Sequence, residues 1–158
     1  MPNVAKQLPP FLREPSFMKH RPYDVLQSII QIFDVYYGSE ARNRLKLMPL
    51  AITVSKSDLL KYFPPIASQS YSFLNPSTDK DSFNLREMEI IGREVRDFLS
   101  IYGDDRQFVE ITRLFPQVGF FAVSSTGWPP DEHGRYLQIE PIRCTDPVLW
   151  ILHTLGYY

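Results

Sequence analysis

Two short apolar runs, each followed at once by polar residues, limit most strongly what this chain can fold into. The first run covers residues 50–54 and leads into the sequence SKSD at residues 55–58. The second covers residues 118–123 and leads into SSTG at residues 124–127. Continuous apolar runs of this length are typical of strands that are covered on both faces, as in parallel sheets. Ligands bind at the carboxyl ends of such strands, so both polar clusters are candidate site segments.

Helical patterns lie around and between the two runs. Apolar residues at helical spacing predict four helices, which run from Pro22 to a stop at Gly38, from Asn84 to Gly103, from Asp104 to Pro116 and from Asp146 to Gly156. The resulting order of helix, strand, helices, strand and helix predicts an α/β fold with a parallel sheet built from crossover units.

The length of the chain, 158 residues, fits one domain with a core of useful size. Residues 1–21 contain four prolines and are predicted to be an extended, proline-rich lead-in. We assign the α/β domain to residues 22–158. Within it, the polar sequence from about residue 62 to residue 82 is predicted to be an irregular insertion.

Composition excludes several classes of protein. A net charge of -1 argues against a nucleic-acid binder that relies on phosphate contacts. The single cysteine, Cys144, excludes an internal disulfide and a zinc site made of thiolates. The N-terminal sequence has no apolar signal-peptide region, and no apolar run approaches the roughly 18 residues that span a membrane. A cytoplasmic location, no membrane partner and no metal site are therefore expected.

Taken together, the two polar clusters resemble the base-recognition motifs of P-loop GTPases of the translation-factor-related (TRAFAC) class, in particular bacterial double-GTPase-like domains. The residues that carry the resemblance are Ser55, Lys56 and Asp58 in the position of the N-K-x-D motif, and Ser124 and Ser125 in the position of the S-A motif. The resemblance covers the chain from about residue 23 to residue 156. It implies a three-layer, parallel-sheet P-loop-NTPase-like domain.

The resemblance also implies a role for each matched residue in binding a guanine nucleotide. Asp58 accepts hydrogen bonds from the guanine N1–H and amino groups, the Lys56 side chain lies along the base and ribose, and a backbone N–H near Ser125 meets the guanine O6. The implied nucleotide-binding residues are Ser55, Lys56, Asp58, Ser124, Ser125 and Thr126. Trp128, beside the second cluster, is suited either to flank a base or to cover the sheet.

The selectivity that the resemblance implies has a chemical reason. A carboxylate that faces two N–H donors forms a charge-assisted bidentate pair, and adenine does not offer those two donors. A base that lacks them would leave Asp58 desolvated and unpaired, at a cost of about 1–3 kcal/mol.

The chain departs from the family pattern in three ways. Ser55 replaces the asparagine of the N-K-x-D motif. None of the seven glycines is followed by lysine, so the phosphate loop G-x-x-x-x-G-K-[ST] is absent. The sequence DEHG at residues 131–134 spells the magnesium-side motif D-x-x-G, but it follows the S-A position and no strand leads into it. We interpret DEHG as a turn.

We therefore expect a partial GTPase-like domain whose N-terminal half, with the phosphate loop, is absent. GTP or GDP is the expected ligand, and Mg²⁺ would bind only together with the missing half. No catalytic residue is identified, and this chain alone is predicted to be inactive in GTP hydrolysis. The expected partner is an N-terminal GTPase half, or another protein, that pairs with the open edge of the strand at residues 50–54. The alternative is a nucleotide-free α/β interaction module derived from a GTPase. An enzyme acting on another substrate in the same crevice would need a base or nucleophile that the sequence does not show.

Overall fold

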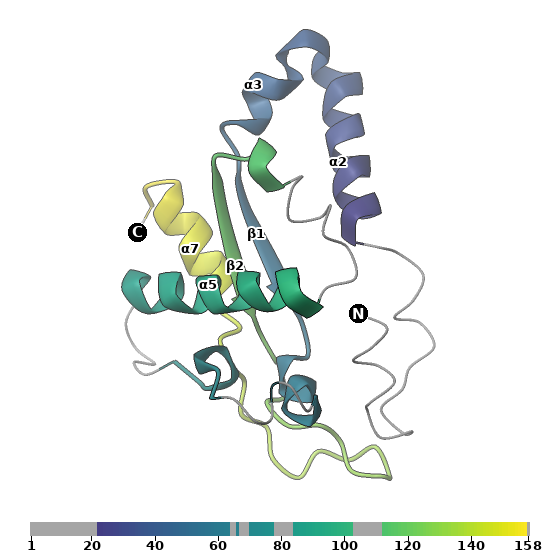
Figure 1. Ribbon diagram of the computed structural model, residues 1–158, viewed down its shortest axis with the longest axis vertical. Helices are drawn as coiled ribbons and strands as arrows, with labels where there is room; N and C mark the ends of the chain where they lie inside the picture. Colours follow the sequence, from purple (N-terminus) through teal and green to yellow (C-terminus); the bar gives the residue numbers. More distant parts are fainter. Residues whose placement is uncertain (1–21, 64–65, 67–69, 78–83, 103–111, 158) are drawn as a thin grey trace.

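A pair of parallel strands lies at the centre of the protein. The computed structural model describes residues 22–63, 66, 70–77, 84–102 and 112–157. Strand β1 (Pro49–Val54) pairs in parallel with β2 (Gln117–Ala122), so that Leu50 lies opposite Val118 and Val54 opposite Ala122 (Figure 1). The two predicted strands and their parallel pairing are confirmed, and the protein is a mixed helix and strand structure with a small parallel sheet.

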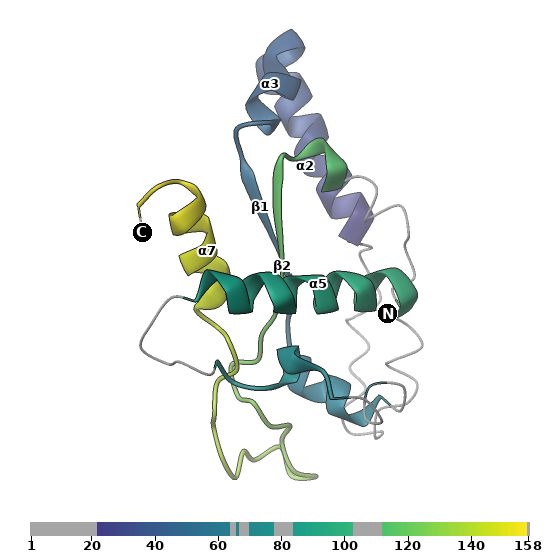
Figure 2. The same cartoon turned by 60° about the vertical axis from the view of Figure 1, so that its left-hand side comes forward.

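Helices surround this sheet in the predicted order. Helix α2 (Pro22–Tyr37) ends at Gly38, whose φ of +50° is a left-handed conformation, and the short helix α3 (Ala41–Leu45) follows. Helix α5 (Leu85–Tyr102) crosses the two strands, and α7 (Asp146–Thr154) is the last helix (Figures 1 and 2). Of the helix predicted from Asp104 to Pro116, residues 104–111 lie outside the described residues, as does the predicted lead-in at residues 1–21. Residues Thr112–Leu114 form a 3-10 helix.

The two faces of the sheet are covered by different helices. Neighbouring residues of a strand point to opposite faces, and Phe120 and Phe121 illustrate this alternation. Phe120 belongs to the main core cluster, to which α5 contributes Ile91, Val95 and Phe98. The Phe121 ring instead lies 5.7 Å from the Trp150 ring of α7. Helix α5 therefore covers one face of the sheet and α7 covers the other.

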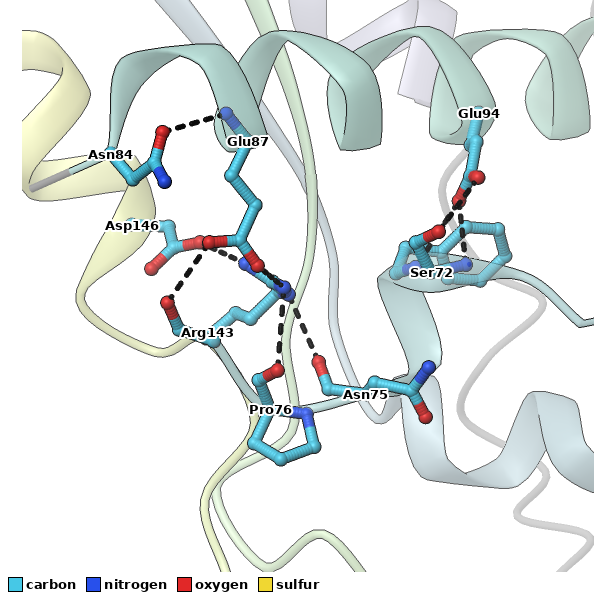
Figure 3. A network of polar contacts seen from close by, with 10 residues as sticks. Ser72, Asn75, Pro76, Asn84, Glu87, Glu94, Arg143 and Asp146 are labelled. Atoms are coloured by element: carbon cyan, nitrogen blue, oxygen red, sulfur yellow. Dashed lines mark hydrogen bonds and ion pairs between the residues drawn. The ribbon is translucent and has the colours of Figure 1, made fainter. Parts of the chain in front are cut away.

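Part of the predicted irregular insertion contributes to the core. Residues Ser72–Leu74 form a 3-10 helix, η5, whose Phe73 is fully buried against α5. The Glu94 carboxylate of α5 accepts hydrogen bonds from the Ser72 and Phe73 backbone N–H groups, at 2.8 and 3.2 Å (Figure 3). The insertion is thus held to α5 by a charged side chain and an aromatic anchor. Residues 64–65, 67–69 and 78–83 lie outside the described residues.

Helix α2 is anchored at the beginning of the strands. Leu26 of α2 packs with Leu45 of α3 and with Phe115, and Ile30, Phe33, Leu50 and Val118 surround this second cluster.

Within the described part of the chain, no helix is both long and apolar enough to cross a membrane.

The two strands differ in how well they are buried. Residues 120–122 of β2 are buried, whereas no residue of β1 is, and Thr53 is exposed. Among the described residues the sheet has two strands only, so the second edge of β1 has no strand partner there. An apolar strand with a free edge is a site at which another strand can pair.

Candidate functional site

The two polar clusters meet at the carboxyl ends of the strands. The Val123 N–H donates to the Val54 carbonyl at 2.9 Å, and the Ser57 N–H donates to the Val123 carbonyl at 3.0 Å. These bonds continue the β1–β2 ladder beyond the last strand residues. The loops at residues 55–58 and 124–127 therefore lie side by side at one end of the sheet, as the sequence predicted.

The turn after β1 depends on Lys56. This residue has φ 54° and ψ 42°, a left-handed conformation that costs a residue with a side chain about 1–2 kcal/mol. The 3-10 helix η4 (Ser57–Tyr62) begins immediately after it. As a result Ser55 and Lys56 are exposed, while the next two residues turn into the protein.

Asp58 is buried, although a carboxylate that reads a base has to reach that base. Its exposed fraction is 3%, and that of Ser57 is 0%. The Asp58 Oδ1 and Ser57 Oγ atoms have no hydrogen-bond partner among the residues that the structure describes. A buried polar atom without a partner costs about 1–3 kcal/mol, so native proteins rarely keep one without a reason. The physical cause of the burial is the start of η4 directly after Lys56.

The second loop uses its first serine for its own structure. Ser124 is buried, and its Oγ accepts a hydrogen bond from the Gly127 N–H at 2.8 Å. The loop is paired with the segment at residues 140–142: the Ser124 N–H donates to the Ile142 carbonyl at 3.0 Å, and the Glu140 N–H donates to the Thr126 carbonyl at 2.9 Å. Ser125 is exposed, and its backbone N–H donates no hydrogen bond to any described residue.

Lys61 links the two loops, and the sequence pattern did not identify it. Its Nζ donates to the Gly127 carbonyl at 3.4 Å and lies 4.6 Å from the centre of the Trp128 ring. The indole Nε1 of Trp128 donates to Glu140 at 3.4 Å. A cation over an indole ring stabilises by roughly 0.5–1 kcal/mol at a partly exposed position. Lys61 follows Asp58 by three residues. The sequence did not predict the 3-10 helix η4, which places the Lys61 side chain beside the second loop.

Arg143 holds the second loop to the rest of the protein, and it too was not predicted. Its guanidinium group pairs with the carboxylates of Glu87 and Asp146, the latter at 3.1 Å (Figure 3). It also donates to the carbonyls of Asn75 and Pro76, at 3.0 and 3.4 Å. Burial raises the pKa of Asp146, although the hydrogen bond from Arg143 acts in the opposite direction. Because Arg143 directly follows Ile142, this network fixes the segment that pairs with Ser124.

The chemical groups at the two loops can donate and accept hydrogen bonds and can stack against a flat ring. They supply the Asp58 carboxyl group, the Ser57 hydroxyl, the Lys61 ammonium and the Trp128 ring. No cluster of three or more metal-ligating side chains occurs among the described residues. Cys144 is exposed as a residue, but its Sγ is partly buried and donates to the Ser124 carbonyl at 3.2 Å. This partial burial raises the pKa of the thiol, which disfavours the reactive thiolate. A cavity of about 380 Å³ lies elsewhere, between α5, β2 and Trp150.

The sequence DEHG forms a turn, as interpreted above. The Asp131 Oδ1 accepts hydrogen bonds from the backbone N–H groups of Arg135, at 2.8 Å, and His133, at 2.9 Å. The Arg135 side chain donates to the other carboxylate oxygen at 3.0 Å. Gly134 has a φ of +76°.

We expect the pKa of Asp131 to lie below its ordinary value of 3.8, because the Arg135 backbone N–H, then the His133 N–H and the Arg135 side chain, favour the charged form. A lowered pKa in the folded state stabilises the protein above pH 3.8, and this contribution is lost as the pH falls through the folded pKa. NMR titration of the side-chain carboxyl carbon of Asp131 measures this pKa. A pKa at or above 3.8 would mean that these bonds do not persist in solution.

Comparison with known proteins identifies no relative. No protein-family model, no curated protein and no solved structure matches this chain.

Proposed function

We propose that this chain is the guanine-recognition half of a P-loop GTPase-like domain of the translation-factor-related class. The observation that carries the proposal is the meeting of the SKSD and SSTG loops at the ends of adjacent parallel strands. A buried oxygen of Asp58 there has no hydrogen-bond partner in the described part of the chain. The presence of a helix on each face of the sheet supports the three-layer P-loop-NTPase-like architecture that this function requires.

The residues fit the base of a guanine nucleotide and do not fit its phosphates. The Oδ1 of Asp58 has no partner among the described residues and suits one N–H donor of the guanine edge, and the other oxygen suits the second. The backbone N–H of Ser125, which donates to no described residue, suits the guanine O6. At the phosphate end, the chain has no glycine followed by lysine and so lacks the backbone cradle and cation that hold phosphates. GTP hydrolysis by this chain alone is not expected.

The roles of the remaining site residues follow from their positions. The exposed Lys56 side chain would lie along the base, while its left-handed backbone turns Asp58 inward. The Ser124 Oγ accepts the hydrogen bond from the Gly127 N–H. The Thr126 carbonyl accepts the hydrogen bond from the Glu140 N–H. These two residues shape the loop instead of contacting the base with their hydroxyl groups.

Burial of Asp58 makes binding conditional on an opening of the loop. A base can reach the carboxyl group only after the groups that cover it move, and the observed affinity is reduced by the fraction of molecules in the open state. We therefore expect weak binding by the isolated chain. An N-terminal partner that pairs with the free edge of β1 would favour the open state by completing the sheet.

A second candidate is a nucleotide-free interaction module with the same fold. The observation that favours it is the 3% exposure of Asp58, because a residue that never meets a ligand has no need to be accessible. In that case the free edge of β1 would be the functional surface. The two candidates differ in whether guanine binds and whether Asp58 decides the selectivity.

Calorimetric titration of the full chain with guanosine, adenosine and xanthosine diphosphates tests the proposal. We expect guanosine diphosphate to bind at least about 10-fold more tightly than adenosine diphosphate, corresponding to about 1.4 kcal/mol for the unpaired carboxylate. Asp58→Asn should shift the preference toward xanthosine, whose edge offers an acceptor in place of the guanine amine.

Asp97→Asn is the matched control, because Asp97 is an exposed aspartate on α5 and should leave the guanine preference unchanged. Equal affinities for the three nucleotides, or no binding of any of them, would contradict the proposal and favour the interaction module.

A further inference from the structure

Helix α2 exposes a stripe of apolar side chains. Val25, Ile29, Ile32 and Tyr36 have exposed fractions of 51%, 39%, 56% and 82%. They are separated by four, three and four residues, so they lie along one side of the helix. This spacing is the one by which two helices pack against each other in a coiled coil.

The stripe lies beside the buried face of α2. Three stripe residues directly precede a residue of that buried face: Leu26, which belongs to the second core cluster, and Ile30 and Phe33, which pack against it. One residue corresponds to a rotation of about 100° around a helix, so the stripe is about a quarter-turn from the core. Figure 1 shows α2 projecting beyond the end of the sheet, away from α5 and α7. A helix that is apolar over more than its core face usually packs against a further surface.

We propose that two copies of this chain pair through the α2 stripe in an antiparallel arrangement. The four–three–four spacing is symmetric about the midpoint between Ile30 and Gln31. An antiparallel pair related by a two-fold axis therefore places Val25 opposite Tyr36 of the second copy and Ile29 opposite Ile32. The small Val25 then faces the large Tyr36, and two isoleucines face each other beside the two-fold axis.

The charges of α2 favour this occupant over others. The charged residues of the helix are Asp24 and Asp34, and neither belongs to the stripe. The positions beside the stripe are Ser28 and Val35 on one side and Leu26 and Phe33 on the other, so self-pairing brings no like charges together. Helix dipoles also oppose each other favourably in an antiparallel pair. A negatively charged membrane surface is a poorer occupant, because α2 itself has no basic residue.

The size of the stripe predicts a weak dimer. The four side chains expose on the order of 400–500 Å² per copy, so a symmetric pair would bury roughly 1,000 Å² in total, just below the range of about 1,200–2,000 Å² for stable interfaces. A dissociation constant in the micromolar range is therefore expected. The inference does not depend on guanine binding, because α2 contributes none of the candidate site residues.

Sedimentation velocity of the full chain over a wide concentration range tests the proposal. We expect the mass to rise from that of the monomer to that of the dimer. Ile32→Glu should remain monomeric at every concentration, because pairing would bury two uncompensated carboxylates, one from each copy, near the two-fold axis. Leu137→Glu is the matched control, since Leu137 is an exposed leucine outside the stripe, and should dimerise like the natural chain. A natural chain that stays monomeric, or an Ile32→Glu variant that still dimerises, would overturn the proposal.

Cysteine cross-linking tests the direction of the helices. In a Cys144→Ser background, an equal mixture of Ile29→Cys and Ile32→Cys chains should form mixed cross-linked dimers well above the share of about one half that random pairing gives. A parallel pair would instead favour cross-links between identical positions, and that result would contradict the antiparallel arrangement. A thermal melt of each variant identifies any loss of folding.

Discussion

Arg143→Met is expected to lower the free energy of unfolding by about 3–5 kcal/mol, because it leaves two carboxylates in the protein interior without their cation. The side chains of Arg143, Glu87 and Asp146 are only 3%, 15% and 8% exposed. The same substitution removes the donors that satisfy the carbonyls of Asn75 and Pro76. Urea denaturation of the natural chain and the variant measures the difference.

Arg135→Met is the matched control, because Arg135 forms a comparable ion pair with Asp131 at the surface, where its own side chain is 70% exposed. Exposed pairs contribute little, so the free energy of unfolding of this variant should lie close to that of the natural chain.

The loss of unfolding free energy caused by Arg143→Met should also become smaller at low pH. A raised pKa of Asp146 in the folded state means that protonation stabilises the protein at low pH, and that this stability is lost as the pH rises through the folded pKa. Similar effects of Arg143→Met and Arg135→Met would contradict the proposed role of the buried network.

Gly127→Ala is expected to destabilise the protein by about 2–5 kcal/mol, from about 1–2 kcal/mol for the left-handed backbone and about 1–3 kcal/mol for a steric clash. Gly127 has a φ of +71°, and a Cβ atom there would lie 1.9 Å from the Glu140 carbonyl oxygen. To remove the clash, the two segments joined by the Glu140–Thr126 hydrogen bond would have to separate. Denaturant unfolding of the variant tests this expectation.

Gly134→Ala separates the two contributions. Gly134 has a similar φ of +76°, but no atom lies within 4 Å of its added Cβ. This variant should therefore show the backbone cost alone, and Gly127→Ala should be less stable than Gly134→Ala. Equal destabilisation by the two substitutions would show that the SSTG loop and residues 140–142 are not held together as closely as the contacts imply.

The parts of the fold that arise from local sequence patterns were predictable. The apolar runs gave both strands to within about one residue, and Gly38 marked the end of α2. Asn84 does cap α5, since its Oδ1 accepts the Glu87 N–H at 3.0 Å. The Glu87 side chain does not complete a capping box by bonding back to Asn84, however, because it pairs with Arg143. A contact over 56 residues of sequence prevails over a local one here, and local patterns cannot reveal it.

The candidate site was predictable in position but not in detail. The rule that strand ends of a parallel sheet lie together placed the two clusters correctly. The left-handed conformation of Lys56, which turns Asp58 inward, has no local signal, because lysine rarely adopts it. The link through Lys61 and Trp128 likewise depends on the bend of η4. The insertion is polar in composition, but it packs through the buried Phe73 and through the Glu94 carboxylate, which accepts hydrogen bonds from its backbone.

Two-dimensional NMR of the isotope-labelled full chain during titration with guanosine diphosphate tests the central claim most directly. We expect chemical-shift changes at Ser57, Asp58, Ser125 and Gly127, and much smaller changes there with adenosine diphosphate at the same concentration. Changes confined to Gly92 and Gly119, which line the cavity between α5 and β2, would place any nucleotide away from the two loops. That result, or equal changes with both nucleotides, would contradict guanine recognition by this chain.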